Sequence, residues 1–124
     1  MKNDEYKVIT PFGEAVRSLR REHRILLKEM ADELEIWPSY ISSVETGKKP
    51  LGDAFVERVV SFFESRGIAA EHLYDAAARS KTSLTIDLEN VSGEQRQVAV
   101  ALARRLPDLT DQQRKRMWRI LAGG

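Results

Sequence analysis

Residues 27–47 read LKEMADELEIWPSYISSVETG, and this stretch decides the fold. Its first half predicts a short amphipathic helix, because apolar side chains recur there at i, i+3, i+4 and i+7. These apolar residues are Leu27, Met30, Ala31 and Leu34. Pro38 then begins a second helix, since proline is tolerated in a first turn but breaks a helix interior. Ile41 and Val44 form the inward face of that helix, and Gly47 suits the left-handed position just after its end.

The turn between these two helices is formed by Glu35, Ile36 and Trp37, and two short helices joined in this way form a helix-turn-helix. Upstream, Thr10 and Pro11 predict the start of another helix, with Thr10 as its N-cap. Downstream, two further helices are predicted, the first strongly apolar and the second rich in alanine. They cover residues 53–65 and 70–79.

The C-terminal part of the chain predicts a short, mainly helical extension. Ser92 with Gln95, and Thr110 with Gln113, are capping-box pairs that begin two more helices. Residues 82–88 alternate polar and apolar side chains and form the only strand-like pattern in the sequence. We therefore expect an all-α fold in three parts. These are a flexible N-terminal arm (residues 1–9), a five-helix domain (residues 10–80) and the C-terminal extension (residues 81–124).

The composition is that of a globular protein, 42% hydrophobic and 31% charged, and it contains no cysteine. The absence of cysteine excludes disulfides, a thiolate nucleophile and a thiolate-bound metal. The only two histidines, His23 and His72, lie outside any metal-ligand pattern, and no glycine-rich phosphate loop is present. We therefore expect a protein without enzymatic activity, metal or cofactor. No apolar run approaches the roughly 18 residues of a membrane span, so a cytoplasmic protein without a membrane partner is expected.

The charge is close to balanced, with a formal net charge of +1. Residues 1–51 carry nine Lys/Arg and nine Asp/Glu, whereas residues 92–124 carry seven Lys/Arg and three Asp/Glu. Many DNA-binding domains are more basic than this. A DNA-binding function for this chain therefore depends on where its charges lie.

The pattern over residues 12–47 resembles the Cro/repressor-type (Xre) helix-turn-helix family of DNA-binding transcriptional regulators. The resemblance extends over about 55 residues when the apolar helix at residues 53–65 is included. The matching residues are Phe12, Gly13, Val16, Leu19, Arg20, Met30, Ala31, Leu34, Ile36, Ile41, Ser42, Glu45, Thr46, Gly47 and Lys48. It implies a five-helix repressor-like domain that binds double-stranded DNA as a homodimer, with residues 38–46 as the recognition helix in the major groove.

The candidate DNA-binding residues follow from this placement together with helical spacing, which turns Ser39, Ser42 and Ser43 away from the core. The resemblance implies base reading by Ser39 and Ser43, and backbone contacts from the residues near the helix end. The full candidate set is Lys28, Trp37, Pro38, Ser39, Tyr40, Ser42, Ser43, Thr46, Lys48 and Lys49. Alternatively, the serines and lysines form an ordinary solvated surface, and the two aromatic residues are core or dimer contacts.

The resemblance also implies an ion pair between Arg20 and Glu45 that joins the first helix to the recognition helix. The sequence departs from the family at the second helix and the turn. Leu27 stands where a phosphate-binding glutamine is common, so Lys28 is the expected substitute, and Glu35 stands where a glycine usually makes the turn. Trp37 replaces the small hydroxyl residue that usually caps the recognition helix.

The extension lies outside the resemblance, and its apolar residues have two interpretations. They either form a dimer or partner interface, within residues 82–121, or complete the core of one monomer. The expected function is transcriptional regulation, by a repressor that binds a two-fold symmetric operator. The alternatives are an antitoxin-type regulator whose C-terminal part binds a toxin, and a protein-interaction module on a helix-turn-helix scaffold without DNA binding.

Overall fold

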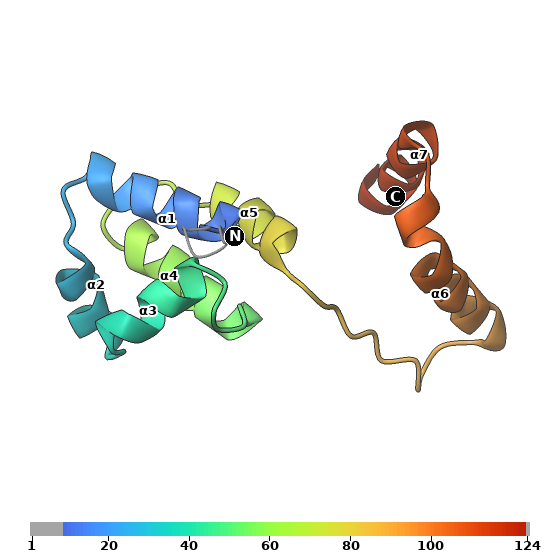
Figure 1. The fold of residues 1–124 in the computed structure, drawn as a ribbon, viewed down its shortest axis with the longest axis horizontal. Helices are drawn as coiled ribbons and strands as arrows, with labels where there is room; N and C mark the ends of the chain where they lie inside the picture. Colours follow the sequence, from blue (N-terminus) through green and yellow to red (C-terminus); the bar gives the residue numbers. More distant parts are fainter. Residues whose placement is uncertain (1–8, 124) are drawn as a thin grey trace, which may run out of the picture. The chain divides into compact units, whose positions relative to one another are not determined.

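The computed structural model describes residues 9–123, and the chain is all-helical over that range (Figure 1). The predicted flexible arm, residues 1–9, lies outside the described residues except for Ile9. The chain divides into two compact units between Leu84 and Thr85. Because the relative placement of the two units is not determined, each is described by itself.

The N-terminal unit consists of five helices and the loops between them. They are α1 (Pro11–Glu22), α2 (Leu27–Leu34), α3 (Pro38–Glu45), α4 (Asp53–Glu64) and α5 (His72–Ser80). All five contribute to one hydrophobic core, in which Val59 and Phe63 of α4 are completely buried. Helix α1 packs against α3 and α5, and α4 packs against α2 and α5. This unit therefore has a continuous core that holds α3 against its neighbours.

The helix ends of this unit follow from the local sequence. Thr10 is the N-cap of α1, as predicted, and its Oγ1 accepts a hydrogen bond from the Gly13 amide at 3.0 Å. Helix α2 ends at Leu34, and its C-cap Glu35 is a non-glycine residue in the left-handed region with φ of 57°. After α3 the chain turns at Gly47, whose φ of +81° is the conformation that glycine adopts readily.

Three polar contacts fasten the outer parts of the unit to each other. The Phe12 amide donates to Ser80 Oγ at 2.8 Å and ties the start of α1 to the end of α5. Lys81 Nζ lies 3.0 Å from Asp53 Oδ1 and donates to the Leu51 carbonyl at 3.2 Å, which holds the loop before α4.

The C-terminal unit is a helical hairpin of α6 (Gly93–Arg105), a 3-10 turn η2 (Leu106–Asp108) and α7 (Asp111–Gly123). Both predicted capping boxes are present, with Ser92 Oγ accepting from the Gln95 amide and Thr110 Oγ1 accepting from the Gln113 amide, each at 3.1 Å. No described residue of this hairpin is buried. Its helices thus rest on local sequence signals rather than on a core of their own.

The strand-like pattern at residues 82–88 corresponds to no strand in the structure. The segment runs without regular secondary structure from the end of α5 toward α6 (Figure 1). A strand requires a hydrogen-bonded neighbour, and the described part of the chain contains no other strand to pair with it. Among the described residues, none of the helices is both long and apolar enough to cross a bilayer.

Candidate nucleic-acid interface

Helix α3 has one face buried in the core and another that faces solvent. Ile41 is completely buried, and Val44 and Glu45 are 2% and 1% exposed. On the helical wheel, Ser39 lies opposite this buried face, and its side chain is exposed. The first turn of α3 therefore presents a hydroxyl to solvent on a helix that is held firmly from behind.

The three candidate serines differ in how far they are exposed. Ser39 is exposed as predicted, whereas Ser42 and Ser43 are half-buried, which corrects the expectation that all three point freely outward. The buried face is wider than expected because Glu45 joins Ile41 and Val44 in the core. In addition, the loop after α3 folds back, and the Lys48 amide donates to the Ser43 carbonyl at 2.8 Å.

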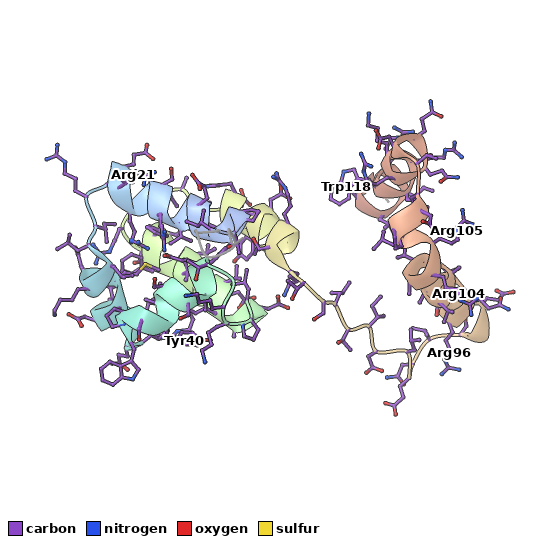
Figure 2. All side chains as sticks on the ribbon, viewed as in Figure 1. Arg21, Tyr40, Arg96, Arg104, Arg105 and Trp118 are labelled. Carbon is purple, nitrogen blue, oxygen red and sulfur yellow. The ribbon has the colours of Figure 1, made fainter. Side chains whose placement is uncertain are left out.

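The two aromatic candidates lie at the N-terminal end of α3 and differ in their packing. Trp37 is the N-cap residue and is 79% exposed, so it belongs to the surface of this unit and not to its core. Tyr40 is 37% exposed, because its ring packs edge-on against Phe55 with the ring centroids 5.9 Å apart (Figure 2). Pro38, the first residue of α3, is half-buried.

The remaining candidates surround α3 with different degrees of freedom. Lys48 and Lys49 are exposed on the loop that follows the helix. The Thr46 hydroxyl donates to the Ser42 carbonyl at 3.0 Å, so its hydrogen is used within α3. Lys28 is exposed on α2, where its Nζ lies 3.0 Å from Asp32 Oδ2. Such an exposed pair contributes little to stability, so the lysine can exchange Asp32 for another anion at small cost.

The end of α3 is fixed by an ion pair that includes one residue the sequence analysis missed. Arg20 Nη1 lies 2.6 Å from Glu45 Oε2, and Arg17 Nε lies 2.8 Å from Glu45 Oε1. Glu45 is 1% exposed, so both carboxylate oxygens are engaged away from bulk water. Arg17 stands three residues before Arg20, which places it on the same face of α1. That spacing was the signal that could have identified it.

The backbone of Glu45 is held as well as its side chain. The amide and the hydroxyl of Thr10 both donate to the Glu45 carbonyl, each at 3.0 Å. Gly13 passes so close to the same carbonyl that an added Cβ would overlap it, and this explains a glycine inside α1. We call Thr10, Gly13, Arg17, Arg20 and Glu45 the Glu45 clamp. It joins α1, from its N-cap to its last turn, to the last turn of α3.

Helix α2 is anchored to the end of α4 by a second charged group. Arg66 Nη2 lies 2.6 Å from Glu33 Oε1, and Arg66 Nη1 lies 3.0 Å from Glu29 Oε2. The hydrogen bond that Arg66 donates to the Glu33 carboxylate is the main cause that raises the pKa of the Arg66 guanidinium above its ordinary value. The same guanidinium stacks over the Phe62 ring at 4.5 Å. The Leu34 carbonyl, at the end of α2, accepts a hydrogen bond from Arg58.

The exposed side chains around α3 include hydroxyl, aromatic and lysine groups. No group of three His, Cys, Asp or Glu within residues 9–123 is placed to hold a metal ion. No protein-family model, curated protein or solved structure matches this chain. What the geometry supplies is a short helix with hydroxyl and aromatic side chains at its exposed N-terminal end, flanked by lysines that are free to move.

Proposed function

We propose that this protein is a sequence-specific, double-stranded DNA-binding transcriptional regulator of the cytoplasm. In this proposal α1–α5 form a five-helix repressor-like domain, and α2, the turn at residues 35–37 and α3 form its helix-turn-helix. Residues 38–46 are the recognition helix, which enters the major groove, and the protein acts as a homodimeric repressor.

The observation that carries the proposal is the contrast between the two faces of α3. A helix that reads base edges must keep its orientation while one face remains free. The Glu45 clamp supplies the first property, because side-chain and backbone atoms of Glu45 are both held by α1. The exposed Ser39 and Trp37 supply the second property at the N-terminal end, the end that meets base edges in this class of proteins.

The exposed side chains have chemistry suited to a duplex. A serine hydroxyl donates or accepts, so Ser39 fits several base edges, and the apolar ring of Trp37 suits the methyl group of thymine. Lys48 and Lys49 provide mobile positive charges for phosphates. Because the N-terminal half of the chain is electrically balanced, we expect few phosphate contacts and a correspondingly modest dependence of affinity on salt.

The short length of α3, which has only eight residues, supports the proposal of a homodimer. One such helix contacts too few base pairs to specify a site in a genome. Two copies related by a two-fold axis double the contacts on half-sites about one helical turn apart. Repression then requires only that the bound dimer block access to the promoter.

The first test is a titration of the purified protein against labelled duplex from the region upstream of its own gene. Scrambled duplex serves as competitor, and the titration is run at two salt concentrations. The Ser39→Ala/Ser43→Ala variant is expected to keep its fold and lose the preference for its own sequence. Ser18→Ala/Ser61→Ala is the matched control, since these serines are exposed on α1 and α4, away from the recognition helix.

Two results would decide against the proposal. One is the absence of duplex binding at near-physiological salt, which would favour the interaction-module alternative. The other is binding without sequence preference, equal in the wild type and in both serine variants, which would reduce α3 to a solvated surface.

A further inference from the structure

The helical hairpin carries an apolar groove that no part of the hairpin covers. The groove has a volume of about 420 Å³ and lies between α6 and α7. Its floor includes Val98 and Leu102 from α6, and Met117 and Leu121 from α7. Val98 is 68% exposed and Leu121 is 72% exposed, so large apolar side chains stand in water along its length. Apolar side chains gathered in this way leave a surface that a partner helix can cover.

The shape of the groove indicates a helix as its occupant. On α6 the lining residues Val98, Leu102 and Arg105 are four and three positions apart, and on α7 Gln113, Met117 and Leu121 are four positions apart. Each helix therefore presents one stripe, and the two stripes together form the seat that a third helix occupies in a bundle. The 13 residues of α6 span about 20 Å, which matches a partner helix of three to four turns.

The charge at the edge of the groove indicates the chemistry of the partner. Arg105 and Arg116 line the groove, and no acidic residue does. Asp111, one of only three acidic residues in positions 92–124, already pairs with Arg114 at 2.9 Å. Figure 2 shows Arg104 and Arg105 extending from the hairpin into solvent. The groove thus combines an apolar floor with a positive border.

A second copy of the hairpin is a poor match for this border. If two copies paired their grooves face to face, Arg105 and Arg116 of both copies would lie in one interface. No acidic residue lines the groove to neutralise these positive charges. Like charges brought together in this way oppose association. A partner helix with acidic residues beside its apolar stripe packs against the apolar floor and also pairs its carboxylates with the two arginines at the border.

We propose that the α6–α7 groove binds an amphipathic α-helix of a partner protein, one whose apolar stripe is flanked by aspartate or glutamate. This mode of recognition lays the apolar face of a helix into a groove, with anchors at i, i+3 or i+4, and i+7. The proposal concerns the second unit only and stands independently of DNA binding by α3.

The test uses the full chain and three labelled synthetic peptides of 16 residues, followed by fluorescence anisotropy at 150 mM salt. The first peptide has a leucine stripe flanked by glutamate, the second has the same stripe flanked by lysine, and the third is a scrambled form of the first. We expect the glutamate peptide to bind at least tenfold more tightly than either of the others. Operator binding is measured on the same samples, so that failure of one proposal is distinguished from failure of the other.

Charge reversal at the border makes the test specific. Arg105→Glu/Arg116→Glu is expected to weaken the glutamate peptide at least tenfold and to strengthen the lysine peptide. Arg104→Glu/Arg119→Glu is the matched control, because both arginines are exposed on the same helices but do not line the groove. Two results would overturn the proposal: equal binding of both charged peptides, or a peptide that binds only by dissociating dimers of the chain, which would make a second copy the occupant.

Discussion

The two units of the chain contain similar amphipathic helices but use them differently. In residues 9–84 the apolar stripes of five helices meet, and Phe12, Met30 and Phe63 are almost completely buried. In the hairpin no described residue is buried, and Trp118 and Ile120 are 65% and 66% exposed. Helical periodicity therefore predicts that a helix forms, but it does not predict what covers the apolar face of that helix.

The difference follows from the number of helices that can meet. Two helices touch along one line, so each keeps most of its surface in water, whereas five helices enclose a volume between them. The hairpin compensates with strong local signals, namely a capping box at each helix start. The N-terminal unit adds contacts between distant residues, such as the Glu45 clamp. The following substitutions compare the two units pair by pair.

The largest contrast is expected between a buried and an exposed aromatic residue. Phe63→Ala leaves a cavity in the core and should lower the free energy of unfolding by about 3–5 kcal/mol. Trp118→Ala removes a ring that is mostly in solvent and should change it by less than about 0.5 kcal/mol. Chemical denaturation followed by circular dichroism measures both values. Equal losses in the two variants would mean that the hairpin has a core of its own.

The next contrast is between a buried and an exposed ion pair. Arg20→Ala leaves the buried Glu45 carboxylate with Arg17 alone and should cost about 2–3 kcal/mol, less than complete loss of a buried partner. Arg114→Ala removes a pair in which both side chains are mostly exposed, so a change below about 0.5 kcal/mol is expected. The same denaturation experiment compares them. An unchanged midpoint for Arg20→Ala would exclude the clamp as a source of stability.

Two helical glycines sharpen the comparison further. Gly13→Ala forces a Cβ against the Glu45 carbonyl and should cost about 1–3 kcal/mol while displacing the end of α3. Gly93→Ala meets no atom within 4 Å and should be neutral or stabilise α6 by less than about 1 kcal/mol. Thermal melts give the stabilities, and the duplex titration that tests the proposed function gives the effect on α3. If Gly13→Ala melts like the wild type and gives the same titration, the close approach is not required.

The smallest contrast is between the two types of N-cap. Thr10→Ala removes the cap of α1 and a hydrogen bond to α3, so a global loss of about 1–2 kcal/mol is expected. Ser92→Ala removes only the cap of α6, so a similar local cost should appear as faster amide exchange in the first turn of the hairpin. Hydrogen exchange resolved by residue separates the two effects. Exchange that spreads into α1–α5 in Ser92→Ala would show that the units are coupled.

Much of the fold was predictable because its determinants are local. The helix starts at Thr10, Ser92 and Thr110 follow from capping residues, and the break before Pro38 follows from the chemistry of proline. The strand-like pattern at residues 82–88 forms no strand, because alternation alone does not supply a partner strand. The two interpretations of the extension could not be separated either, since burial depends on packing between elements.

The candidate site was predictable in outline and less so in detail. The pairing of Arg20 with Glu45, expected from the family resemblance, is present at 2.6 Å. The partial burial of Ser42 and Ser43 depends on how far α3 is drawn toward α1, a quantity that no sequence pattern encodes. Arg17, in contrast, could have been found from its spacing to Arg20. The left-handed conformation of Glu35 could be anticipated from the sequence, because this residue stands where a glycine usually makes the turn.

The Glu45 clamp also separates the residues that hold α3 from those that α3 displays. Every contact of the clamp is made at the last residue of the helix, whereas Trp37 and Ser39, at the other end, take no part in it. Substitutions at those two positions are therefore nearly free of folding cost. If α3 reads DNA as proposed, its sequence preference can change through single substitutions at its exposed end while the scaffold stays folded.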